Sequence, residues 1–125
     1  MADRTGTDDL AAVIDWVAGG PAPERSVQRA AVKESLATVV ARAPGRAVEV
    51  RVPPFGAAQC LTGPQHTRGT PPNVVETDPR TWLALVIGAL TWNDAVGSGR
   101  LTASGSRAGE VAELLPLSRP HHPTG

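Results

Sequence analysis

The feature that most constrains the fold is an unbroken stretch from Val75 to Ser106, in which helix and strand signals follow one another closely. Asp78 and the proline after it predict a helix start, because aspartate caps the free amides of a first turn and proline fits the first helical position. Thr91, with an aspartate three residues later, predicts a second short helix. Glycines end this helix, and residues 100–104 then favour a strand. This segment is expected to pack as one unit.

Apolar side chains at helical spacing predict further helices on both sides of that stretch. The first is expected to begin at Asp8 or Asp9 and to end at a Gly-Gly pair, and the second to run from about 24 to 43. A last helix is expected after Ser106, which can cap it, and a proline stops it ten residues later.

Strands are predicted where the apolar period changes to two. Valines alternate with charged residues at 48–52, and weaker alternation at 57–62 gives a plausible partner strand in a hairpin. Residues 74–76 are expected to form a third short strand. We therefore expect an α+β fold, with a small, mostly antiparallel sheet of four to five strands covered by helices.

The chain of 125 residues favours a single domain, expected here over residues 8–117. Residues 1–7 are expected to be a flexible N-terminus, and residues 118–125, rich in proline and histidine, a disordered tail.

Charge and hydropathy exclude several classes of partner. Twelve basic and twelve acidic residues cancel, and no basic stripe points to nucleic acid. The N-terminus is unlike a signal peptide and the longest apolar run is far too short to span a bilayer, so we expect a cytoplasmic protein without integral membrane association. The single lysine and the abundant alanine, glycine and proline suggest a GC-rich, actinobacterial genome.

The best candidate for a polar site is the loop that holds His66, Thr67 and Arg68. A loop histidine titrates near neutral pH, and an arginine grips a carboxylate or phosphate in bidentate fashion. These groups can hold an anionic head group at a pocket mouth. The alternative, which we favour for the loop alone, is a surface connection whose polar groups bond to Glu76 or to backbone carbonyls.

No catalytic or metal-binding motif accompanies this loop. Cys60 is the only cysteine and is expected to be a small buried hydrophobe, although a thiol nucleophile with His66 as its base is a weaker alternative. His121 and His122 are adjacent but lack further ligands, so no metal site is predicted.

The segment 75–79 (VETDP), followed by Trp82 and Leu85, resembles the signature of the sterol-carrier-protein type-2-like domains. The residues around Trp92 and the segment 99–105 (GRLTASG) are similar as well. The likeness is to the bacterial sterol carrier family proteins, and related modules form the C-terminal part of mycothiol-dependent maleylpyruvate isomerases. It covers most of the chain from the first strand to the last helix.

The resemblance implies a sheet covered on one side by helices, with an apolar tunnel between the layers that binds sterols, fatty acids or acyl-CoA. Some members of the family are only accessory domains. This chain is short and shows about four strands rather than five, so a smaller sheet is expected.

We therefore predict a non-catalytic protein that binds a lipid or another small apolar ligand in a pocket between sheet and helices, without a cofactor. An alternative is an interaction or accessory module that docks onto a partner enzyme and has no ligand of its own. A third hypothesis is a thiol-dependent enzyme domain that lacks its catalytic half. The scarcity of aromatic residues leaves a core of small side chains, which suits a cavity. The residues expected to line the pocket are Val50, Phe55, Trp82, Leu85, Val86 and Leu101, with His66, Thr67 and Arg68 at its polar rim.

Overall fold

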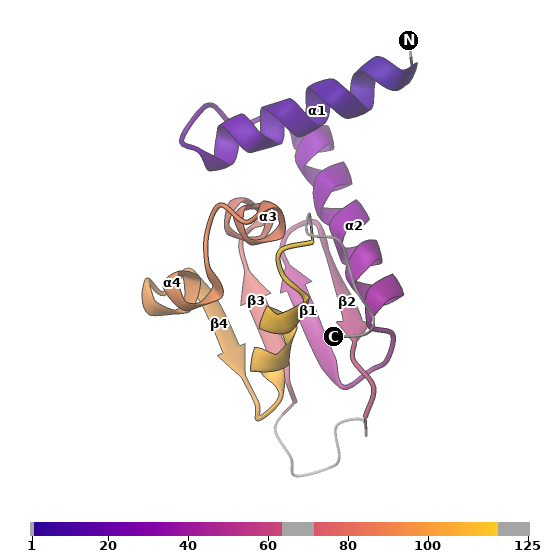
Figure 1. The fold of residues 1–125 in the computed structure, drawn as a ribbon, viewed down its shortest axis with the longest axis vertical. Coiled ribbons are helices and arrows are strands. Elements are labelled where there is room, and N and C mark those ends of the chain that lie inside the picture. The colour runs from indigo at the N-terminus through magenta and orange to yellow at the C-terminus, as the bar shows by residue number, and fades with distance from the viewer. Residues whose placement is uncertain (1, 64–71, 118–125) are drawn as a thin grey trace.

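The computed structural model describes residues 2–63 and 72–117, with side chains of the first helix described from Asp9 onward. The elements, in chain order, are α1 (Ala2–Val17), α2 (Arg25–Arg42), β1 (Val48–Val52), β2 (Gly56–Cys60), β3 (Val74–Thr77), α3 (Pro79–Ile87), α4 (Trp92–Gly97), β4 (Leu101–Ser104) and the 3-10 helix η1 (Ala108–Leu114) (Figure 1). The expected domain boundaries and the flexible end at 1–7 stay predictions, and the tail expected at 118–125 lies outside the described residues.

The described strands form one sheet in the order β2-β1-β3-β4. The β1–β2 hairpin is antiparallel, with Val48 opposite Cys60, and β3 and β4 are antiparallel as well. The central pair differs, because β3 runs parallel to β1 and places Val75 beside Val50. The predicted α+β class is therefore confirmed, and the mostly antiparallel sheet contains one parallel pair.

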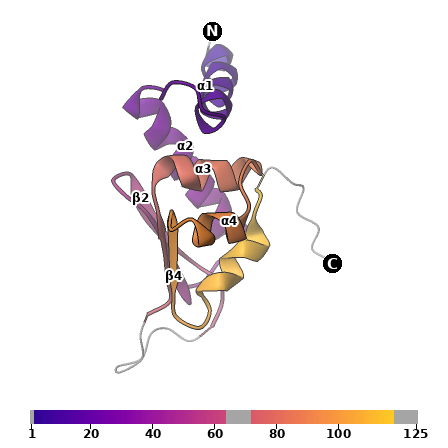
Figure 2. The same cartoon turned by 90° about the vertical axis from the view of Figure 1, so that its left-hand side faces the viewer.

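Helices cover one face of this sheet, as the edge-on view in Figure 2 shows. Because side chains alternate across a strand, the valines of β1 all point to this face and are buried. Helix α2 packs along the hairpin, α3 begins directly after β3, and α1 lies across the end of α2 and α3 (Figure 1). The largest fully buried side chains of this core are Trp82, Leu85, Leu101, Val32, Val39, Val48, Val50, Val52, Val75, Val111 and Cys60.

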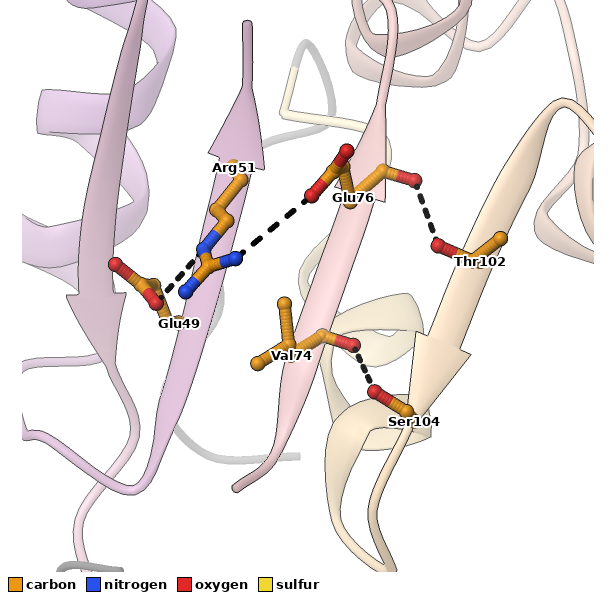
Figure 3. A network of polar contacts seen from close by, with 6 residues as sticks. All are labelled: Glu49, Arg51, Val74, Glu76, Thr102 and Ser104. Atoms are coloured by element: carbon orange, nitrogen blue, oxygen red, sulfur yellow. Dashed lines mark hydrogen bonds and ion pairs between the residues drawn. The ribbon is translucent and has the colours of Figure 1, made fainter. Parts of the chain in front are cut away.

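The opposite face of the sheet is polar. Arg51 on β1 lies between two acidic side chains, with its Nε 3.0 Å from Glu49 Oε1 and its Nη1 3.9 Å from Glu76 Oε1 (Figure 3). These groups are about a third to a half exposed, so their pairing contributes little to stability. At the same face, the hydroxyl groups of Thr102 and Ser104 on β4 donate to carbonyl oxygens of β3. This polar face is exposed to solvent.

The two predicted caps in the C-terminal half are confirmed. Asp78 Oδ2 accepts a hydrogen bond of 3.0 Å from the Thr81 amide at the start of α3. Thr91 Oγ1 accepts one of 3.1 Å from the Asp94 amide at the start of α4. Gly88 ends α3 in the left-handed conformation, with φ of 83°.

Three local expectations are wrong. Helix α1 begins at Ala2 and not at Asp8 or Asp9, because a residue able to cap does not prevent a preceding helical turn. Strand β2 ends at Cys60, since Leu61 has φ of 69° and its amide donates to the Ala43 carbonyl instead of to the ladder.

The third concerns the last helix. Ser106 does not cap it: the helix is a 3-10 helix that starts at Ala108, and its N-cap, Arg107, makes no side-chain cap bond. The Arg107 amide instead donates to Asn73 Oδ1 at 3.0 Å. The asparagine comes from the segment just before β3, so a tertiary contact replaces the local cap.

Candidate functional site

An apolar groove of about 400 Å³ lies among α1, α2 and α3. Cavities of roughly 300–1,000 Å³ are typical of small-molecule sites. Its apolar lining consists of Leu10, Val13, Val27, Ala30, Ala31, Leu83, Val86, Ile87 and Leu117, and its polar lining of Asp9, Glu34, Ser35, Thr38 and Arg42.

Each wall of the groove follows from helical periodicity. Helix α2 contributes residues that recur every three or four positions from Val27 to Arg42, so its wall runs along most of that helix. Helix α3 contributes the side opposite, and α1 closes one end. Val13 anchors α1 there with 3% exposure.

Two hydrogen bonds fix the positions of these walls relative to one another. Arg80 Nε on α3 donates to the carbonyl oxygen of Trp16 at 3.1 Å, which ties the end of α1 to α3. The Leu117 amide donates to the Val86 carbonyl at 2.9 Å, which holds the chain after η1 beside α3. The groove therefore joins segments from both ends of the described chain.

The serine in the groove wall does not offer a free polar group. Ser35 Oγ accepts a hydrogen bond of 2.8 Å from the indole Nε1 of Trp82, and it donates one of 2.8 Å to the Val32 carbonyl. The charged groups of the lining come from Asp9, Glu34 and Arg42. Chemically, the groove can take an apolar body with a polar or charged end.

Of the six residues expected to line a pocket, Val86 lines this groove. The other five lie in the packed core between sheet and helices, where none is more than 6% exposed: Val50, Phe55, Trp82, Leu85 and Leu101. The observed hollow is thus among the helices and not between helices and sheet. Whether any of the six contacts a ligand stays a prediction.

Phe55 also has a second structural role. The guanidinium carbons of Arg25 and Arg29, both on the first turns of α2, lie 5.2 and 5.8 Å from the centre of its ring. These are cation–π contacts, and they fasten the start of α2 to the β1–β2 turn. His66, Thr67 and Arg68, the expected polar rim, lie outside the described residues.

Sequence reasoning missed the walls that α1 and α2 supply. Val32 and Leu36 of α2 are buried and belong to the hydrophobic core, so they form a different face of the helix. A signal for the second face was present, because Val27, Ala30 and Ala31 are apolar or small and precede Glu34 at helical spacing.

Cys60 is a free, fully buried thiol. Burial removes the favourable hydration of a thiolate and so raises the pKa of Cys60 above its usual value. The structure thus gives no support to a thiol nucleophile. No group of three metal-ligating side chains gathers among residues 9–63 and 72–117, whose side chains the structure describes.

A family model described as bacterial SCP ortholog matches residues 24–117, which is more than half of the chain. No curated protein matches the chain. The matched range begins at the N-cap of α2 and includes every later element, whereas α1 lies before it. None of the described helices has the length and apolar character needed to cross a membrane.

Proposed function

The chain belongs to the family of bacterial SCP orthologs, and from that premise we propose that it binds a lipid or another small apolar ligand in the groove among α1, α2 and α3, without catalysis. The observation that supports this proposal most directly is the groove itself, with its nine apolar or small lining residues. Burial of an acyl chain or ring there gains about 25 cal/mol for each Å² of apolar surface removed from water.

The charges of the groove favour one orientation of the ligand. Arg42 stands in the last turn of α2, whereas Asp9 belongs to α1 and Glu34 to the middle of α2. An acidic head group is attracted to the arginine and repelled by the two carboxylates. We therefore place the head at Arg42 and the apolar body toward α1.

Displacement of a fluorescent fatty acid tests the groove. NBD-labelled stearate is titrated into the protein and competed with oleate, and native mass spectrometry looks for lipids that copurify from the natural host. Ala30→Trp fills the groove and should weaken binding at least tenfold. Ala41→Trp is the matched control, because Ala41 is exposed on the same helix but outside the groove. Equal binding by both variants, or none by the wild type, would count against the proposal.

The orientation has its own test. Arg42→Gln should weaken oleate about tenfold and leave the uncharged oleyl alcohol nearly unchanged, because only the carboxylate uses the guanidinium. An equal loss for both ligands would contradict the placement of the head group. The rim expected at His66, Thr67 and Arg68, and the cytoplasmic location, stay predictions.

One observation favours the alternative, an interaction module that docks onto a partner enzyme. Leu10 and Ile14, one turn apart on α1, are 55% and 47% exposed, so two large apolar side chains of this helix face solvent. Ile14 does not line the groove. Ile14→Glu should therefore abolish partner capture and spare NBD-stearate binding if docking is the function, and affect neither if it is not.

A further inference from the structure

A second hollow, of about 360 Å³, shares no residue with the groove. It lies between the end of α1, the start of α3 and the start of β4. Its lining is Val17, Asp78, Arg80, Thr81, Ala84, Ala89, Leu90 and Arg100. All of these except Val17 belong to the stretch 75–106, so that stretch builds a surface hollow as well as caps and core.

Two arginines of this hollow are held in place from outside it. Arg80 uses its Nε to donate to the Trp16 carbonyl at 3.1 Å, which leaves its terminal nitrogens for another acceptor. The backbone of Arg100 is fixed on both sides, because its amide donates to Ala95 and its carbonyl accepts from Thr77 Oγ1 at 2.8 Å. The Nε atom of Arg80 and the backbone of Arg100 are therefore both held by hydrogen bonds.

Asp78, the acidic residue of the hollow, already accepts hydrogen bonds at both of its carboxylate oxygens. Asp78 Oδ2 accepts from the Thr81 amide at 3.0 Å, and Oδ1 accepts from the Thr81 hydroxyl at 2.7 Å. Among the side chains that the structure describes, those of residues 9–63 and 72–117, the ion pairs closer than 4.0 Å involve Arg51 and Arg107, and neither Arg80 nor Arg100 takes part in one. The lining of the hollow therefore carries two guanidinium groups, from Arg80 and Arg100, and one carboxylate, from Asp78, so its charges sum to one positive charge in excess.

We propose that this hollow is a binding site for a small organic anion, whose carboxylate or phosphate group is held by Arg80 and Arg100. Guanidinium groups bind both kinds of oxyanion through paired, charge-assisted hydrogen bonds. The small apolar walls, formed by Val17, Ala84 and Leu90 among others, accommodate a short apolar body. Because Val17 and the Trp16 carbonyl come from α1, which precedes the family match, the site belongs to this chain and not to the matched region alone.

The experiment is a titration of the ¹⁵N-labelled full chain followed at the arginine Nε–H resonances. Benzoate, phenyl phosphate and inorganic phosphate are compared with sodium chloride at equal ionic strength. The Arg80 and Arg100 signals should shift and saturate with benzoate or phenyl phosphate, and the one that binds more tightly identifies the head group. Tighter binding of inorganic phosphate than of both would overturn the assignment to an organic anion.

Variants separate this site from general charge effects. Arg100→Gln should weaken binding at least tenfold without loss of the fold, because the side chain is exposed and anchored only through its backbone. Arg46→Gln, which removes an exposed arginine outside the hollow, is the matched control and should bind as the wild type does. Equal shifts of all arginines, or unchanged binding by Arg100→Gln, would overturn the proposal.

The proposal for the groove and the proposal for the anion site can be refuted independently of each other. Saturation with benzoate should leave NBD-stearate affinity unchanged, because the two sets of lining residues do not overlap. Loss of stearate binding in Ala30→Trp with intact benzoate binding would confirm two independent sites. Competition between the two ligands would refute the separate anion site.

Discussion

The hydrogen bond between Trp82 and Ser35 gives the sharpest test of how the groove wall is built. The indole Nε1 lies 2.8 Å from Ser35 Oγ, and the Trp82 side chain is 0% exposed. Ser35→Ala removes the acceptor and leaves a buried N–H without a partner. Such a stranded donor costs about 1–3 kcal/mol, so we expect the free energy of unfolding to fall by about 2 kcal/mol, in line with that range.

A double-mutant cycle isolates this bond from the loss of packing. Trp82→Phe removes the donor and also empties part of the core, so alone it costs more than Ser35→Ala. In the Trp82→Phe background no indole N–H remains to be stranded, and Ser35→Ala should then cost little. The expected coupling energy is about 1–2 kcal/mol, well above the roughly 0.3–0.5 kcal/mol scatter of independent sites.

Urea unfolding of all four proteins is followed by circular dichroism, because Trp82→Phe leaves Trp16 and Trp92 and so changes the fluorescence signal between variants. Thermal unfolding gives a second reading, at about 4 °C for each kcal/mol in a domain of this size. If Ser35→Ala costs the same in both backgrounds, the hydrogen bond does not stabilise the fold and the reasoning is refuted. Unchanged m-values are the control for a comparable unfolded state.

Three further predictions follow from single contacts. Asp78→Ala should lower the free energy of unfolding by about 1 kcal/mol, because α3 loses its cap, and Asp78→Asn should restore most of it, as urea unfolding will measure. Gly45→Ala should destabilise far more than Gly99→Ala, because a Cβ at Gly45 meets the Leu61 carbonyl whereas one at Gly99 has no neighbour within 4 Å. Cys60 should resist Ellman's reagent in the native state, and its contribution to stability should be constant below about pH 9.0 and fall above it, because its pKa is raised in the folded protein and only the unfolded thiol ionises readily there.

Each of these three predictions would be contradicted by a specific result. Equal stability of Asp78→Ala and the wild type would show that the cap is replaced by water. Similar losses at Gly45 and Gly99, which both have positive φ, would show that backbone conformation and not the close contact decides the cost. A Cys60→Ala variant with the same alkaline slope as the wild type would assign that slope to another group.

The sequence predicted those parts of the fold that depend on neighbours a few residues away. The caps at Asp78 and Thr91 were found because a cap bonds an amide three residues along the chain. Strand β1 was found because its alternating valines report one buried face. The family resemblance came from the same stretch, and the matched family model agrees with it.

The candidate sites escaped prediction because their residues meet only in the folded chain. The carbonyl of Trp16 and the side chain of Arg80 are 64 positions apart, and their contact sets both the groove and the second hollow. The apolar periodicity of α1 does not predict that this helix will cross α3. Of the six apolar residues predicted to line a pocket, Val86 lines the groove and the other five are packed in the core, because apolarity alone does not distinguish a wall from a filled core.

Local chemistry therefore determined where the helices and strands of this protein lie, both limits of β1, and the family resemblance. The tertiary structure decided that β3 runs parallel to β1, that Asn73 rather than Ser106 serves the start of η1, and that the open space lies among helices. The physical reason is the distance along the chain over which each effect acts. Capping and alternation act within one helical turn or one strand. A groove, in contrast, exists only where segments distant in sequence pack imperfectly.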